Sequence, residues 1–284
     1  MSVPNAPTPD ISGKVEIDGV SIHYDYFGDK TKPVVVVFNG VSMETRSWFQ
    51  FLPFFGDGVD KLFWDFRGQG QSTSDDQPYD VCAHADYLKK IIETLALKPE
   101  QTNLIGISSG SIIEAEFLRQ HSAMVNKAVL SGVLLSPEKT FIYGSEFGIK
   151  LLREGMLDLW AETLYGTLFS SAYLEVIEPF IPKLKAALSA RYKDRALALA
   201  RIIEAQMNYV INVKNYYDDF KKVDVPMLLI AGEEDVLTPP FVQKKVLDLF
   251  GRTPKYLEYA GCGHMMAMER SKDFFGDAVN FVLS

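Results

Sequence analysis

The stretch Gly106-Ile107-Ser108-Ser109-Gly110 decides how the rest of this sequence is interpreted, because it matches the pattern Gly-x-Ser-x-Gly. Residues 102–107 read Thr-Asn-Leu-Ile-Gly-Ile, which predicts a short buried strand. Residues 111–119 carry apolar side chains at helical spacing. A serine between these two elements lies on a sharp turn beside a helix N-terminus, where backbone N–H groups favour negative charge. The stretch therefore predicts a nucleophilic serine at residue 108.

Strand-like and helix-like patterns alternate on both sides of this turn. Strands are predicted at residues 15–17, 20–27, 33–38, 62–66, 102–107, 127–135, 226–232 and 255–259. Helices are predicted at residues 80–97, 111–119, 240–250 and 272–282. Strands that alternate with helices are typical of a parallel α/β sheet.

The alternation is interrupted between residues 136 and 222, where the sequence contains no obvious buried strand. Long helices are expected there at residues 149–165 and 187–210. We therefore expect a core domain made of residues 1–135 and 223–284, with a helical cap domain, residues 136–222, inserted between its two parts. Residues 1–13 are rich in Pro, Ser, Thr and Asn and are expected to form a flexible N-terminal tail.

The composition limits the class of protein. Of the 284 residues, 47% are hydrophobic, which is enough for a large core. The net charge is −8, and basic residues form no run longer than a pair, which argues against a nucleic-acid partner. Two cysteines define no disulfide framework and favour a reducing compartment, so we expect a cytoplasmic protein. We also expect neither a signal peptide nor a transmembrane segment, and the sequence leaves the oligomeric state open.

A serine hydroxyl becomes nucleophilic when a base accepts its proton and an acid orients that base. His264 is the candidate base, because it follows the last predicted strand and so lies at the sheet edge that carries Ser108. Asp235, at the end of the preceding strand, is the candidate acid, with Glu233 and Glu234 as competitors. The resulting chain order is serine, aspartate, histidine.

Other motifs are interpreted as structural. The glycine-rich segment 67–72 lacks the Gly-Lys-[Ser/Thr] ending of a phosphate-binding loop, so we expect a turn in which Arg67 is paired at the rim of the core. His23, His84 and His121 lie on a predicted strand, on a helix and after a helix, and are expected to support the fold. The motifs His-Glu-x-x-His and Cys-x-x-Cys are absent from the sequence, and we predict no metal and no cofactor.

Taken together, these features resemble the α/β-hydrolase superfamily over nearly the whole sequence. The resemblance is carried by Asn39-Gly40-Val41, Asp65 to Ser72, Gly106 to Gly110, Gly232 to Pro239, and Gly263-His264. It implies the α/β-hydrolase fold, with a mostly parallel sheet flanked by helices and a helical cap inserted before the last two strands. It also implies a catalytic triad of Ser108, Asp235 and His264, and an oxyanion hole formed by the backbone N–H groups of Val41 and Ser109.

Five residues are candidates for substrate contact. Asn39 stands where the family usually has histidine, and it is expected to keep the turn while its side chain contacts a loop or the substrate. Gly40 and Ser42 follow it, and Ser42 is also a less favoured oxyanion donor. Trp160 and Phe147 belong to the aromatic residues of the cap, some of which are predicted to line an apolar pocket above the nucleophile.

The sequence predicts a serine hydrolase that cleaves a carboxylic ester or thioester with an apolar acyl group through an acyl-enzyme. In the family that this sequence resembles, dehalogenases and epoxide hydrolases use aspartate as nucleophile, so serine argues against both. One alternative is acyl transfer to an alcohol, because residues 39–48 and 70–72 are similar to bacterial 3-hydroxyacyl transferases. A non-catalytic binding protein on the same scaffold is the other alternative, although such proteins commonly lack a triad member and all three are present here.

Overall fold

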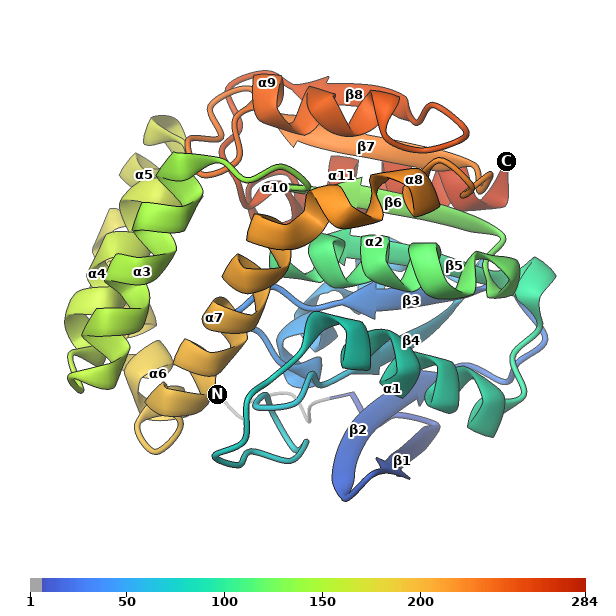
Figure 1. The fold of residues 1–284 in the computed structure, drawn as a ribbon, viewed down its shortest axis with the longest axis horizontal. Coiled ribbons are helices and arrows are strands. Elements are labelled where there is room, and N and C mark those ends of the chain that lie inside the picture. Colours follow the sequence, from blue (N-terminus) through green and yellow to red (C-terminus); the bar gives the residue numbers. More distant parts are fainter. Residues whose placement is uncertain (1–6) are drawn as a thin grey trace.

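A sheet of eight strands forms the centre of the molecule, in the order β1-β2-β4-β3-β5-β6-β7-β8 (Figure 1). The computed structural model describes residues 7–284. Strand β2 is antiparallel to both of its neighbours, and the pairs from β4 to β8 are parallel. The strands are Ile11–Ile17, Val20–Phe27, Val34–Phe38, Asp60–Trp64, Thr102–Ile107, Lys127–Ser131, Met227–Gly232 and Lys255–Tyr259, from β1 to β8. The mostly parallel sheet predicted from the sequence is therefore confirmed.

The first hairpin forms at the predicted turn. Asp18 and Gly19 both have positive φ, 49° and 80°, as a two-residue hairpin turn with the right twist requires. Strand β1 begins at Ile11, four residues before its predicted start, so residues 11–13 do not belong to a flexible tail. Residues 1–6 of that predicted tail lie outside the described residues.

Helices cover both faces of the sheet (Figure 1). Helices α1 (Val81–Leu95) and α2 (Ser109–His121) pack on one face, where their apolar side chains join the larger buried cluster. A 3₁₀ segment, η1 (Thr45–Phe55), and helix α11 (Ser271–Leu283) pack on the other face around Phe275. No helix within residues 7–284 is both long enough and apolar enough to cross a bilayer.

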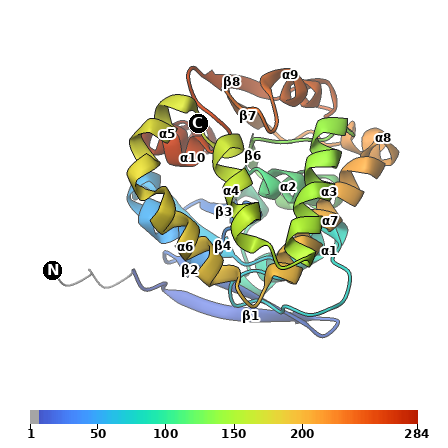
Figure 2. The same cartoon turned by 90° about the vertical axis from the view of Figure 1, so that its left-hand side faces the viewer.

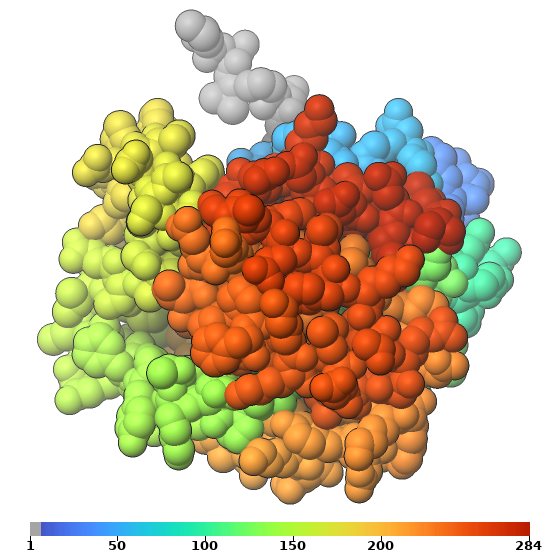
Figure 3. Space-filling model, turned by 90° about the horizontal axis from the view of Figure 1, so that it is seen from above, coloured from blue at the N-terminus to red at the C-terminus, as the bar shows by residue number. Residues whose placement is uncertain are grey.

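The chain between β6 and β7 is helical, as predicted. Its helices are α3 (Lys139–Arg153), α4 (Leu157–Leu168), α5 (Ser171–Ile177), α6 (Ile181–Tyr192), α7 (Ala196–Asn212) and α8 (Tyr217–Phe220). Helices α3 to α6 stand together at one end of the sheet (Figures 1 and 2) and form the left side of the space-filling view (Figure 3). Tyr209 and Val210 of α7 pack into the cluster on the sheet instead. The domain boundaries at 136 and 222 remain a prediction.

Several predicted bounds were wrong for local reasons. The helix expected at residues 149–165 is interrupted at Gly155, which has φ +74°. The helix expected at 187–210 is broken between α6 and α7. Strand β4 ends at Trp64, two residues early, although Asp65 N still donates to His23 O of β2 at 3.0 Å. Strand β6 ends at Ser131, because Gly132 turns the chain with φ +59°.

Candidate active site

Ser108 lies on a strained turn between β5 and α2. Its φ of 56° and ψ of −121° are rare for a residue with a side chain and cost about 1–3 kcal/mol. Two backbone hydrogen bonds of 2.8 Å offset this strain, one from Ser108 N to Ser131 O and one from Ser111 N to Ser108 O. A Cβ atom at Gly110 would collide with the backbone of Phe38, so the glycine allows α2 to start this close to β3.

The structure brings the side chains of Ser108, His264 and Asp235 into one hydrogen-bonded chain. Ser108 Oγ lies 2.7 Å from His264 Nε2, and His264 Nδ1 lies 2.8 Å from Asp235 Oδ2. Because an ionised carboxylate only accepts hydrogen bonds, Nδ1 carries the hydrogen and Nε2 is free to accept the serine proton. His264 and Asp235 are only 1% and 2% exposed, which limits competition from water.

Asp235 is held in place by its own loop. Its Oδ1 accepts hydrogen bonds from the backbone N–H groups of Leu237 and Thr238, at 2.9 and 2.8 Å. The Thr238 hydroxyl and the Gln243 amide donate to Oδ2, at 2.8 and 3.2 Å. Sequence reasoning missed both side chains, although an aspartate three residues before a threonine is a known turn pattern that could have indicated Thr238.

The competing acids of this loop do not contact His264. Glu233 is exposed and accepts a hydrogen bond from Gly261 N at 2.9 Å, and Glu234 is also exposed. The neighbouring Cys262 is buried, and burial together with the charge of Glu269 raises the pKa of its thiol to about 12. Cys262 is therefore a neutral packing residue at physiological pH.

Two backbone N–H groups next to Ser108 are free. Within residues 7–284, neither Val41 N nor Ser109 N donates a hydrogen bond. Both residues line the same cavity as Ser108, and Ser109 is the first residue of α2. Free N–H groups at a helix start can stabilise an oxyanion.

Asn39 is a structural residue in this fold. Its Nδ2 donates to Trp64 O at 2.8 Å and to Gln69 Oε1 at 3.0 Å, and its Oδ1 accepts from Trp48 Nε1 at 2.6 Å. The side chain is fully buried and does not line the cavities beside Ser108. Asn39 therefore contacts a loop through Gln69, as expected. Its position beside neither cavity does not support the expected contact with substrate.

Two cavities meet at Ser108. The inner cavity, of about 150 Å³, lies between α2, α3, α4 and α7. The outer cavity, of about 250 Å³, lies between η1, α4, α6 and α10 (Met266–Glu269). The residues that line both cavities are Val41, Ser42, Ser108, Leu164 and Leu168. Both are lined mainly by apolar side chains.

The remaining predicted contact residues separate into two groups. Trp160 lines the inner cavity, Gly40 the outer one, and Ser42 both. Phe147 lines neither and is 55% exposed, because the side of α3 that faces the inner cavity carries Gly144 and Gly148 instead. The prediction of Phe147 as a substrate contact is therefore not supported by its position.

The arginines near the site are paired with carboxylates of the same chain. Arg67 forms an ion pair with Asp75 at 2.7 Å and lies over the Tyr79 ring, so segment 67–72 is a turn as expected. Arg191, at the outer cavity, pairs with Glu44 at 3.5 Å. Among residues 7–284, the structure contains no group of His, Cys, Asp and Glu side chains suited to a metal ion.

Comparison with known proteins agrees with this architecture. The sequence pattern of the family described as serine aminopeptidase, S33, matches residues 29–271. A bifunctional esterase/perhydrolase of Acinetobacter calcoaceticus is 23% identical, over 94% of this chain and 98% of that protein. A proline iminopeptidase of Lactobacillus helveticus is 25% identical, over 93% and 95% respectively. The crystal structure of MGS-M2, an α/β-hydrolase from a Medee basin deep-sea metagenome library, matches with a TM-score of 0.87 at 23% identity, over 96% of this chain and 98% of that one. The α/β-hydrolase fold and a general hydrolase function, both predicted from the sequence, are confirmed.

Proposed function

The chain belongs to the serine aminopeptidase S33 family of α/β-hydrolases, and we propose that it hydrolyses a short carboxylic ester or thioester through an acyl-enzyme on Ser108. The observation that carries this proposal is the hydrogen-bonded chain Ser108–His264–Asp235 at the junction of two apolar cavities. A cavity of about 150 Å³ holds a group the size of benzene. This size favours a short acyl or alcohol group over a long fatty chain.

The geometry supports a two-step reaction. His264 Nε2 accepts the proton of Ser108 as its oxygen attacks the substrate carbonyl, and Asp235 stabilises the imidazolium that forms. The backbone N–H groups of Val41 and Ser109 stabilise the oxyanion, each contributing about 3–4 kcal/mol to the transition state. His264 then protonates the leaving alcohol or thiol. Water, deprotonated by His264, releases the acid and restores the serine hydroxyl.

The cavities argue against an aminopeptidase reaction, although the family description and the Lactobacillus relative carry peptidase names. An aminopeptidase must hold the positively charged N-terminus of its substrate close to the bond that it cleaves. Among the described residues, neither cavity beside Ser108 is lined by an aspartate or a glutamate. A buried ammonium group without an anionic partner is strongly unfavourable. We therefore expect ester turnover without turnover of proline p-nitroanilide.

The test is hydrolysis of p-nitrophenyl esters with acyl chains of two to eight carbons. Ser108→Ala is expected to lower kcat by several orders of magnitude, because the serine and its base act as a unit. Ser74→Ala, on an exposed loop, is the matched control and is expected to behave as the parent protein. A fluorophosphonate probe should label the parent protein and not Ser108→Ala. Equal turnover by Ser108→Ala, or a folded parent protein that is neither labelled nor active, would exclude this mechanism.

A further inference from the structure

Gln206 of α7 is a buried polar residue in the wall of the inner cavity. Its side chain is 4% exposed. On α7 it shares a face with apolar residues at helical spacing, Leu199, Ile202, Ile203 and Val210. A glutamine on such a face is unusual, because an amide removed from water needs hydrogen-bond partners for its oxygen and its nitrogen.

Only one end of this amide is paired. The Ser109 hydroxyl donates a hydrogen bond of 2.7 Å to Gln206 Oε1. Among the described residues, Gln206 Nε2 is buried and has no hydrogen-bond partner. The hydroxyl of Ser109 fixes the orientation of this amide. Its hydrogen needs an acceptor, and within residues 7–284 that acceptor is Gln206 Oε1, so Oε1 and not Nε2 faces Ser109. The free N–H groups of Gln206 are therefore held beside the residue whose backbone we assign to the oxyanion hole.

The surroundings of Gln206 select for an uncharged oxygen. The inner cavity is lined mainly by apolar side chains, including Ile112, Leu134, Phe141 and Trp160. Thr140 and Ser145 line it as well. Among the described residues, no Lys or Arg lines this cavity, so a carboxylate placed there would lack a counter-charge. A keto, ether or hydroxyl oxygen would satisfy the free amide without introducing a charge.

We infer that Gln206 is a specificity-determining residue, and that the substrate carries an uncharged oxygen acceptor on the arm that occupies the inner cavity. This inference rests on the proposed ester hydrolysis at Ser108 and narrows it to short oxygenated esters. A substrate with a purely hydrocarbon arm leaves the Nε2 hydrogens unpaired, whereas one with a correctly placed oxygen pairs them. Sites that contain a buried donor discriminate against ligands that lack the acceptor.

The experiment compares matched pairs of esters that differ in one oxygen. In the acyl series, p-nitrophenyl 4-oxopentanoate is compared with p-nitrophenyl pentanoate. In the alcohol series, 2-methoxyethyl acetate is compared with butyl acetate. The parent protein is expected to prefer the oxygenated member of at least one pair by about tenfold or more in kcat/KM. The pair that shows the preference identifies whether the acyl or the alcohol arm occupies the inner cavity.

Gln206→Met removes the amide while keeping the length of the side chain, and is expected to abolish that preference. Because both esters of a pair are measured on the same variant, any general effect on Ser109 and the oxyanion hole cancels in the ratio. Asn208→Met, at an exposed position of the same helix, is the control and should keep the parent preference. The inference is overturned when both pairs show no preference in the parent protein, or when Gln206→Met retains it.

A binding measurement separates this inference from the proposed function. In a Ser108→Ala background, calorimetry compares 4-oxopentanamide with pentanamide, and 2-methoxyethanol with butanol. Tighter binding of an oxygenated ligand, lost in Ser108→Ala/Gln206→Met, supports the role of Gln206 even when no ester is hydrolysed. Equal binding within both pairs contradicts the role of Gln206, and ester hydrolysis that depends on Ser108 would still stand.

Discussion

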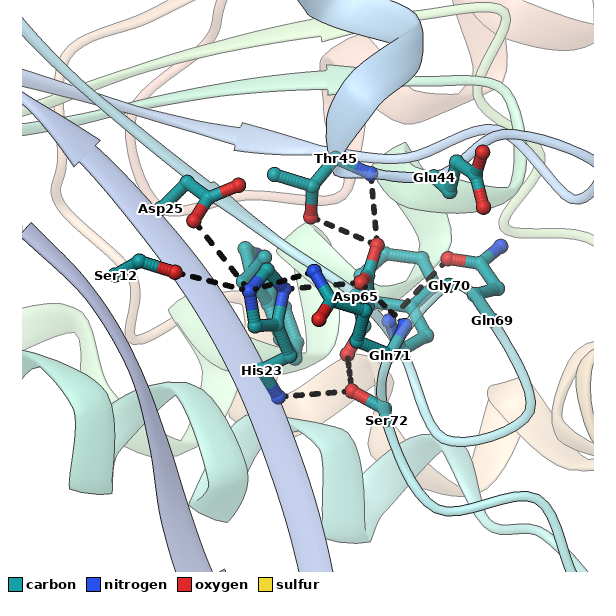
Figure 4. A network of polar contacts seen from close by, with 12 residues as sticks. Ser12, His23, Asp25, Glu44, Thr45, Asp65, Gln69, Gly70, Gln71 and Ser72 are labelled. Carbon is teal, nitrogen blue, oxygen red and sulfur yellow. Dashed lines mark hydrogen bonds and ion pairs between the residues drawn. The ribbon is translucent and has the colours of Figure 1, made fainter. Parts of the chain in front are cut away.

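His23 Nδ1 lies 3.1 Å from Asp65 Oδ2 in a buried network that joins β2 to the loop after β4 (Figure 4). The other carboxylate oxygen of Asp65 accepts hydrogen bonds from the backbone N–H and the hydroxyl of Thr45, both at 2.7 Å. Thr45 begins η1, only four residues after Val41. The network therefore anchors the segment that presents one of the two proposed oxyanion donors.

The network predicts a loss of stability at alkaline pH. Burial lowers the pKa of His23, but hydrogen bonds and charges from Asp25 and Asp65 outweigh burial and raise it to about 9. In the unfolded chain the pKa returns to about 6.5. The contribution of His23 to the free energy of unfolding is therefore complete below pH 6.5, declines as pH rises and is lost above pH 9. Its full size is about 3 kcal/mol.

Urea unfolding at pH 6, 7.5 and 9 measures this loss. His23→Gln cannot carry the charge, so its free energy of unfolding is expected to be lower than that of the parent protein at pH 6 and to change less between pH 6 and pH 9. The same decline in both proteins would mean that other groups cause the alkaline sensitivity.

The contributions of two buried glutamates of α2 to stability are predicted to change in opposite directions with pH. Burial raises the pKa of Glu114 well above its usual value, and neither of its carboxylate oxygens has a hydrogen-bonding side chain beside it. The contribution of Glu114 to stability is complete below pH 4.5. It falls as pH rises, because this carboxyl group ionises at a lower pH in the unfolded chain than in the folded protein. Glu114→Gln cannot ionise, so it is expected to raise the urea midpoint at pH 8 and to leave it nearly unchanged at pH 4.

Glu116 is the matched control for Glu114, two residues further along the same helix. Burial raises the pKa of Glu116, but hydrogen bonds from Arg119 at 2.5 Å and from Tyr209 at 2.7 Å outweigh burial and lower it. Its stabilisation is present above pH 4.5 and is lost as pH falls below that value. Glu116→Gln is expected to destabilise the protein by about 2–3 kcal/mol at pH 8. Stability changes of the same sign in both variants would contradict this assignment.

The core fold and the convergence of Ser108, Asp235 and His264 could be predicted because their signals are local in the sequence. A parallel strand that is buried on both faces reads as a continuous apolar run, as Val34–Phe38 does. The loops that follow such strands meet at one edge of the sheet, so the order of Ser108, Asp235 and His264 already indicated that the three would converge.

Most of the cavity lining could not be predicted, because it depends on how helices pack on each other, although Gly40, Ser42 and Trp160 do line the cavities as expected. The face of α3 that lines the inner cavity carries Phe141, Gly144, Ser145 and Gly148, whereas Phe147 lies on the exposed side. Composition favours aromatic residues as pocket walls, and Phe141 and Trp160 do line the pocket, but the rest of the α3 face carries small residues, of which Gly148 lets Trp160 of α4 approach. Gln206 had a usable signal, a polar residue on an otherwise apolar helical face, which predicts burial with a hydrogen-bonding task.

Gly132 is predicted to be required for the position of His264. A Cβ atom at Gly132 would lie 2.7 Å from His264 Cε1, and its φ of +59° is unfavourable for alanine. Gly132→Ala is expected to displace the imidazole and to lower kcat/KM for p-nitrophenyl esters about a hundredfold. Gly276→Ala in α11 has open space around the new methyl group and should stabilise the helix by about 0.5–1 kcal/mol with unchanged activity. Full activity in Gly132→Ala would show that His264 tolerates the displacement.

Leu164 is predicted to limit the length of the substrate. Its side chain lines both the inner and the outer cavity, so Leu164→Ala joins their free volumes beside Ser108. Each additional buried methylene contributes about 0.8 kcal/mol, so two of them raise kcat/KM for longer acyl chains about tenfold. The chain-length optimum of p-nitrophenyl esters is therefore expected to shift upward by about two carbons. Leu159→Ala, on the same helix but 46% exposed, should keep the parent optimum. Identical profiles for the two variants would mean that Leu164 does not separate the cavities when substrate is bound.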